Sequence, residues 1–153
     1  MFDRILCAVD LEPGSEDVIR CAGRIAERCE GTLRVVFVAD SALLNLKGSV
    51  GRLELPEEQA AAIEQVSLLL REKAAVLLKN LCDALKTDVE PMVLEGSPVA
   101  SRILEHVESW GADLLVVGSH GRRRLKRLLV GSVCNRLVHS ANVPVLVVKT
   151  KEA

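Results

Sequence analysis

Three glycines and a serine between residues 118 and 132 have a spacing that suits a phosphate-binding segment. Two residues separate Gly118 from Gly121, nine separate Gly121 from Gly131, and Ser132 follows directly, a pattern written G-x2-G-x9-G-S. Glycine has no side chain, so the backbone can approach a ligand closely. If a helix begins at Ser132, its free N–H groups and its dipole favour an anion, and the serine hydroxyl adds a donor. The segment matches neither GxxxxGK[ST] nor GxGxxG, so we expect a phosphate site of another kind.

Asp10 is the second residue that could bind a ligand. It follows an apolar run at residues 5–9 and precedes the turn sequence Leu-Glu-Pro-Gly-Ser. An aspartate in this place either binds a ligand at the end of a strand or only shapes the turn that leads into a helix. Residues 114–149 also carry seven basic side chains and no acidic one, although the whole chain has a net charge of −1. This local positive field attracts an anion, but basic side chains in a loop more often form a solvated surface than specific ligand contacts.

The elements that must position these residues alternate between strands and helices. Short apolar runs predict five strands, at residues 5–9, 33–39, 88–94, 114–117 and 145–149. Helical spacing of apolar residues predicts four helices, at residues 15–30, 57–85, 98–110 and 132–140. Gly31 is expected to end the first helix in the left-handed conformation, and Ser97 to cap the third. Residues 40–56 predict an irregular connection, with a short helical turn around Leu43.

This alternation predicts a doubly wound α/β fold. We expect a five-stranded parallel sheet of order 3-2-1-4-5 with helices on both faces. Pro91 cannot donate to a ladder, which puts the third strand at an edge. The long helix after residue 57 carries an apolar stripe that includes Val66, Leu70 and Leu77, and we expect it to lie on the sheet. Ligands of such sheets bind beyond the carboxyl ends of the strands where the winding reverses, here between strands 1 and 4.

Length and composition narrow the functional classes. The chain of 153 residues predicts a single domain, 1–153, and 49% of its residues are apolar. Only 2% are aromatic, which argues against modules that stack nucleic-acid bases. We expect a cytoplasmic protein with no membrane span and with five reduced cysteines, because no signal peptide, long apolar run or C-x-x-C pair occurs. No metal site is expected from its three histidines, of which His106 and His139 should lie on helix surfaces.

Several segments resemble the universal stress protein family. These are Ile-Leu-Cys-Ala-Val-Asp10, Glu-Gly96-Ser-Pro, Ala-Asp113-Leu-Leu-Val-Val-Gly-Ser-His-Gly121, the spaced glycine motif and Val-Pro144-Val-Leu-Val-Val. The resemblance covers the chain apart from residues 40–60, and the motif G-x2-G-x9-G-S/T is the mark of the ATP-binding members. The chain departs from the family after Asp10, where the commoner small residue and serine are missing. No ligand contact is therefore carried over to residues 11–15.

The resemblance implies an adenine nucleotide site. Asp10 would hold the ribose hydroxyls, and Val38 would meet the adenine edge through its backbone. The residues implied around the ribose and phosphates are Gly118, Gly121, Gly131, Ser132 and Val133, with His120 nearby. The neighbouring residues Ala8, Val9 and Ser119 complete the candidate site.

The function expected from these features is that of an ATP-binding regulatory protein in the stress response, with Mg²⁺ accompanying the nucleotide. It would act as a nucleotide-dependent switch and not as an enzyme. A slow ATPase stays open as an alternative, although the sequence offers no Walker lysine, acidic metal pair or base for water. A protein-interaction module without nucleotide is a further alternative, and nucleic-acid binding is disfavoured by the lack of aromatic platforms and of overall basic charge.

The fifth strand predicts a homodimer. It is apolar and lies at the last edge of the expected order, where an uncovered strand invites pairing with another chain. The resemblance implies antiparallel pairing of two final strands, with Val143, Val145, Leu146 and Val147 at the contact. Val145 and Val147 should share one face of the sheet, and Leu146 and Val148 the other.

Overall fold

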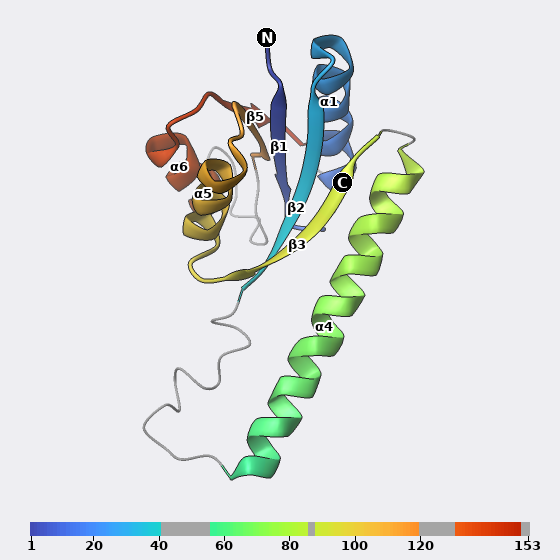
Figure 1. Cartoon of the computed structure of the whole chain (residues 1–153), viewed down its shortest axis with the longest axis vertical. Coiled ribbons are helices and arrows are strands. Elements are labelled where there is room, and N and C mark those ends of the chain that lie inside the picture. The colour runs from blue at the N-terminus through green and yellow to red at the C-terminus, as the bar shows by residue number, and fades with distance from the viewer. Residues whose placement is uncertain (41–55, 86–87, 120–130, 151–153) are drawn as a thin grey trace.

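The computed structural model describes residues 1–40, 56–85, 88–119 and 131–150 (Figure 1). They form strands and helices in the predicted alternation: β1 (Arg4–Val9), α1 (Ser15–Cys29), β2 (Thr32–Asp40), α4 (Glu57–Ala84), β3 (Glu90–Gly96), α5 (Val99–Trp110), β4 (Leu114–Gly118), α6 (Ser132–Ser140) and β5 (Val145–Val148). The expected helical turn around Leu43 and the candidate site residues His120 and Gly121 lie outside the described residues.

The five strands form one parallel sheet of order β3-β2-β1-β4-β5. This confirms the predicted order and puts the Pro91 strand at an edge. Cys7, in the central strand β1, is in register with Val35 on one side and Val116 on the other. The parallel arrangement requires a crossover between each pair of strands, and the helices supply it.

The sheet separates two apolar cores. Alternate residues of β1 point to opposite faces, so Ile5 and Cys7 pack with α1 and α4, whereas Leu6 and Ala8 pack with α5 and α6. Figure 1 shows α1 and α4 on one side of the sheet and α5 and α6 on the other. The predicted division of β5 is confirmed: Val145 and Val147 pack in the α5–α6 core, and Leu146 and Val148 in the α1–α4 core.

Gly31 does not end α1 as predicted. The residue in the left-handed region is Glu30, with φ of 55°, whereas the described glycines with positive φ are Gly14, Gly96 and Gly111. Gly31 is needed for another reason: a Cβ atom there would lie 2.3 Å from the carbonyl oxygen of Phe2. The glycine lets the start of β2 pass close to the segment that leads into β1.

The predicted cap of α5 was also wrong. The helix begins at Val99, its N-cap residue is Pro98, and no side chain caps it. A side chain at the N-cap position can accept hydrogen bonds from the free N–H groups of the first turn. Ser97 lies one residue before that position. Gly111 ends the helix in the left-handed conformation, with φ of 71°.

Only part of the apolar stripe of α4 meets the sheet. The buried residues of this helix are Ala74, Leu78 and Cys82. Val66 and Leu77 of the predicted stripe are 55% and 50% exposed. A helix of 28 residues is about 42 Å long, whereas the nine residues of β2 span about 30 Å. The helix is longer than the sheet it covers, and its N-terminal half extends past the strands (Figure 1).

The five cysteines are free thiols, as predicted. Cys7, Cys82 and Cys134 are buried, and burial raises the pKa of each. For Cys82 the pKa rises to about 11, so this thiol stays protonated at neutral pH. Among the described helices, none is long and apolar enough to cross a membrane.

Candidate functional site

The carboxyl ends of β1 and β4 lie side by side at the point where the sheet reverses its winding. The two strands are adjacent and parallel, and Ala8 is in register with Val117. Val9 and Asp10 therefore leave the sheet at the same edge as Gly118. Because α1 follows on one face of the sheet and α6 on the other, a crevice is expected between the two connections.

Asp10 is half buried, and the two oxygens of its carboxylate have different surroundings. Oδ1 accepts hydrogen bonds from the Glu12 amide at 3.0 Å and from the Ser15 hydroxyl at 3.2 Å. Oδ2 has no hydrogen bond to any of the described residues. The backbone bends sharply at Leu11, whose φ of 62° is uncommon for a side chain of this size. Asp10 thus shapes the turn into α1 and still offers one free acceptor at the carboxyl edge.

Ser119 ties three segments together behind this edge. Its amide donates to the carbonyl oxygen of Val148 at 2.9 Å, and its own carbonyl accepts from the amide of Gly131 at 3.1 Å. Its hydroxyl oxygen accepts from the Thr150 amide at 3.4 Å, and the residue is 6% exposed. The hydrogen bonds of this candidate residue serve the chain itself and hold the start of α6 beside the end of β4.

The first turn of α6 presents free backbone donors. Gly131 is its N-cap with φ of −54°, and no side chain caps the helix. The first intrahelical bond runs from the Asn135 amide to the Gly131 carbonyl at 2.9 Å. The amides of Ser132 and Val133 belong to the first turn and have no acceptor within the helix. With the positive end of the helix dipole, they form a place suited to an anionic group.

Val38 lies in β2, which pairs with β1 at the edge opposite to β4. The pairing of β1 with β2 ends at Val9 and Phe37, whereas β2 and β3 stay paired as far as Asp40 and Gly96. Val38 is therefore the first residue of β2 beyond the end of its neighbour β1. Its side chain is buried in the α5–α6 core.

Two hollows of the surface have neither Asp10 nor the N-terminus of α6 in their linings. The smaller, of about 320 Å³, is lined by residues 11–17 and Leu81, and it contains the carboxylates of Glu12, Glu16 and Asp17. Its acidic lining makes it a poor place for phosphates. The larger lies between α1 and the β5 edge. Among the described residues, no group of three or more His, Cys, Asp or Glu side chains could hold a metal ion.

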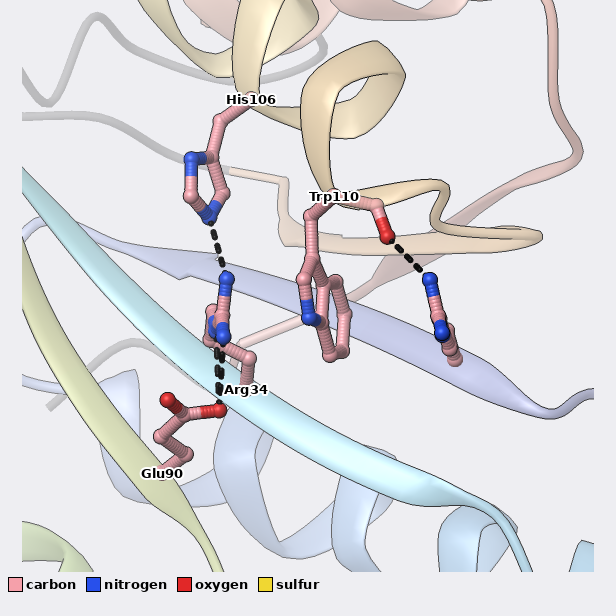
Figure 2. A network of polar contacts seen from close by, with 5 residues as sticks. Arg34, Glu90, His106 and Trp110 are labelled. Atoms are coloured by element: carbon pink, nitrogen blue, oxygen red, sulfur yellow. Dashed lines mark hydrogen bonds and ion pairs between the residues drawn. The ribbon is translucent and has the colours of Figure 1, made fainter.

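A polar network at the opposite end of the sheet was missed by the sequence reasoning (Figure 2). His106 is 8% exposed and not on the helix surface as predicted. Its Nε2 accepts from the guanidinium of Arg34 at 3.1 Å, since arginine can only donate. Arg34 also donates twice to Glu90, at 3.0 and 2.8 Å, and lies 4.3 Å from the ring centre of Trp110. Nothing in the spacing of residues so far apart in the sequence indicated this contact.

Burial lowers the pKa of His106, and the positive charges of Arg34 and Arg102 lower it further, while Glu90 acts in the opposite direction. The imidazole is therefore neutral in the folded protein at neutral pH. Arg34 and Glu90 stand near the starts of β2 and β3, far along the strands from Val38. The network joins α5 to the sheet and is separate from the crevice.

Comparisons with known proteins agree with this geometry. The family model described as "Universal stress protein family" matches residues 1–149. The chain is 32% identical to universal stress protein A homolog 1 of Coxiella burnetii, over 99% of each chain. It is also 32% identical to a universal stress protein of Methanocaldococcus jannaschii, over 97% of this chain and 83% of the relative.

Solved structures show the same fold. The structure of protein MJ0577 superposes with a TM-score of 0.74 at 25% identity, covering 100% of this chain and 99% of the other. A universal stress protein in complex with cAMP has a TM-score of 0.68 at 21% identity, with 98% of both chains covered. One from Archaeoglobus fulgidus in complex with dAMP has a TM-score of 0.56 at 22% identity, over 95% of this chain and 96% of the other. From its fold and from these matches over nearly its whole length, the chain belongs to the universal stress protein family.

Proposed function

We propose that the protein binds ATP in the crevice between β1 and β4 and acts as a nucleotide-dependent regulator in the stress response. The observation that carries the proposal is the placement of the α6 N-terminus. The bond from Gly131 to Ser119 holds the free amides of Ser132 and Val133 beside the strand end that Gly118 forms. Two relatives of the same fold are described in complexes with cAMP and dAMP, which supports an adenine nucleotide as the ligand.

The chemistry of the donor set fits such a ligand. The free Oδ2 of Asp10 can accept hydrogen bonds from ribose hydroxyls, and the backbone of Val38 can meet the polar edge of adenine. The amides of Ser132 and Val133 and the Ser132 hydroxyl can donate to phosphate oxygens. Gly121 and His120 belong to the proposed site through the glycine motif, and Ala8 and Val9 form its floor. Mg²⁺ would be held mainly by the phosphates and water, as is usual for this ion.

The proposal assigns binding and not turnover. Asp10 already holds two donors of its own turn through Oδ1, which suits a residue that orients a ligand. We propose that the nucleotide state alters a surface of a homodimer formed through β5, in a cytoplasmic protein. The free thiols are compatible with that reducing compartment.

Ligand-dependent melting and mass spectrometry test the proposal. ATP with Mg²⁺ at about 100 times its dissociation constant should stabilise the fold by roughly 2.7 kcal/mol and raise the melting temperature. Adenosine should bind more weakly than ATP, because aliphatic side chains offer adenine little stacking and the phosphates supply much of the affinity. Denatured preparations should release ATP; release of ADP alone would favour the slow ATPase instead. No thermal shift with millimolar ATP and Mg²⁺ would refute the site.

A further inference from the structure

A second surface of the protein has the properties of an interface. Among the described residues, eight large apolar side chains are about half exposed or more, and six of them belong to α4: Val66, Leu68, Leu69, Leu70, Val76 and Leu77. Their exposed fractions lie between 48% and 63%. Figure 1 shows that the N-terminal half of α4 extends beyond the sheet. Monomeric proteins rarely leave a contiguous apolar patch of this kind in water.

Five of these side chains form one stripe along the helix. At 100° per residue, Val66, Leu69, Leu70, Val76 and Leu77 fall within about 120° of the helix circumference. Their mean direction is turned by about 135° from that of the buried residues Ala74, Leu78 and Cys82. The stripe is therefore a second apolar face, distinct from the face that lies on the sheet. Leu68 points about 145° away from the centre of the stripe and does not belong to it.

The spacing of the stripe is roughly symmetric about Glu72. Val66 and Leu77 lie six and five residues from Glu72, and Leu69 and Val76 lie three and four residues from it. In an antiparallel pair of α4 helices, Val66 of one copy would therefore meet Leu77 of the second copy, and Leu69 would meet Val76. Leu69 and Val76, and likewise Leu70 and Leu77, lie seven residues apart, which is the repeat of helices that pack at a shallow crossing angle. A patch that complements itself is what a two-fold contact requires.

The charges beside the stripe also fit a second copy. Lys73 is the one charged side chain within it, and Glu72 borders it. Neither has an ion-pair partner in the part of the chain that the structure describes. The antiparallel arrangement brings Lys73 and Glu72 of the two copies together, since both residues lie within one residue of the two-fold axis. Each Lys73 and each Glu72 then gains a partner of opposite charge in the same contact that covers the apolar side chains.

We propose that two copies of this chain associate through the α4 stripe, in an antiparallel two-fold contact centred near Glu72. The surface is separate from the β5 edge, because α4 packs beside β3, at the other end of the sheet, where Arg71 pairs with Glu95 at 2.6 Å. The two contacts are compatible with each other. A protein that uses both forms an assembly larger than a dimer.

Adjacent leucines provide a matched test by sedimentation at tens of micromolar protein. Leu69→Glu places a carboxylate in the stripe, whereas Leu68→Glu places the same group on another face of the same helix, at a site that is 50% instead of 63% exposed. We expect Leu69→Glu to raise the dissociation constant of the α4 contact about tenfold or more, and Leu68→Glu to leave it unchanged. Equal masses for the wild type and both variants, or equal losses in both, would overturn the proposal.

A second substitution separates this contact from the β5 contact. Val147→Pro removes a donor from the outer edge of β5, so a remaining dimer that Leu69→Glu dissociates identifies the α4 contact directly. If Val147→Pro alone yields only monomer, the α4 contact does not exist. Circular dichroism verifies that each variant is folded.

Charge reversal tests the register. Lys73→Glu should weaken the contact, because each copy would then bring two carboxylates to the axis. Adding Glu72→Lys should restore it, since the pair is exchanged but still complementary. A double variant that associates no better than Lys73→Glu would refute the antiparallel pairing about Glu72.

Discussion

The amide nitrogen of Gly131 donates a hydrogen bond to the carbonyl oxygen of Ser119 over 3.1 Å, and this bond sets the first turn of α6 against the end of β4. Only backbone atoms take part, so a side chain at residue 131 need not disturb it. The φ of −54° at Gly131 is open to any residue. The glycine can therefore be replaced without backbone strain.

Gly131→Val is expected to abolish ATP binding while the fold survives. The branched side chain would occupy the space through which phosphate oxygens approach the α6 amides. We expect a loss of affinity of at least about tenfold by calorimetry, near-wild-type circular dichroism, and a smaller loss for Gly131→Ala. Gly121→Val should behave in the same way. If the valine variants keep the wild-type affinity, or lose the fold together with binding, the two glycines only shape turns.

Asp10→Asn should separate ligand binding from the turn. An asparagine can keep the acceptor that Glu12 and Ser15 use at Oδ1, but its amide nitrogen cannot accept a ribose hydroxyl in place of Oδ2. ATP affinity should fall about tenfold, a change of about 1.4 kcal/mol, with little change in melting temperature. The loss should be smaller for a 2′-deoxy nucleotide.

Ser15→Ala is the control for that variant. It removes only the hydroxyl donor to Oδ1, so stability should fall by about 1 kcal/mol while ATP affinity is retained. If Asp10→Asn binds ATP like the wild type, Asp10 is a turn residue and no more.

Val147→Pro should dissociate the proposed β5 dimer. β5 has only four residues, all partly exposed, and it ends the sheet next to β4. The carbonyl groups of Pro144 and Val148 face β4, so the N–H of Val147 faces the outer edge of the sheet. Proline at this position removes a donor that an antiparallel partner strand would use. Equilibrium sedimentation should show a reduced mass. A wild type that already sediments as a monomer, with or without ATP, would contradict both the β5 contact and the α4 contact.

Glu30→Gly and Gly31→Ala should change stability in opposite directions. Glu30 is in the left-handed conformation, which costs a side-chain residue roughly 1 kcal/mol, so glycine there should stabilise by about 0.5 kcal/mol after its chain-entropy cost. Alanine at position 31 would put a methyl group against the Phe2 carbonyl and should cost about 1–3 kcal/mol. Denaturant unfolding measures both. The reverse order would mean that Gly31, as predicted from the sequence, ends the helix.

His106 should make stability depend on pH. Its pKa is lowered in the folded state, so below the ordinary value of about 6.5 the unfolded chain binds a proton that the folded chain rejects. The contribution of His106 to the free energy of unfolding is therefore full above that pH, and stability falls as the pH drops from 7.5 to 5.5. His106→Gln keeps an acceptor for Arg34 but does not titrate, so its stability should fall less over the same range. Identical slopes for the two proteins would show that carboxylates alone cause the dependence.

The sequence by itself determined the order and kind of the elements. Apolar runs of strand length alternate with helical spacing, and right-handed crossovers then leave few topologies, so the sheet order and the edge position of the Pro91 strand could be predicted. The place where Asp10 and Gly118 meet followed from the same topology, because the carboxyl ends of adjacent parallel strands share an edge.

The tertiary structure decided what depends on contacts between distant residues. Gly31 is required by the Phe2 carbonyl, and the buried His106 bonds to Arg34; in both pairs the partner is distant in the sequence. The exposed stripe of α4 is a further case. The periodicity of this helix predicts an apolar face, but it does not predict how much of that face the sheet will cover, because the helix is longer than the sheet. Local patterns report on neighbours along the chain, whereas close approach, burial and exposure are set by the packing of whole elements.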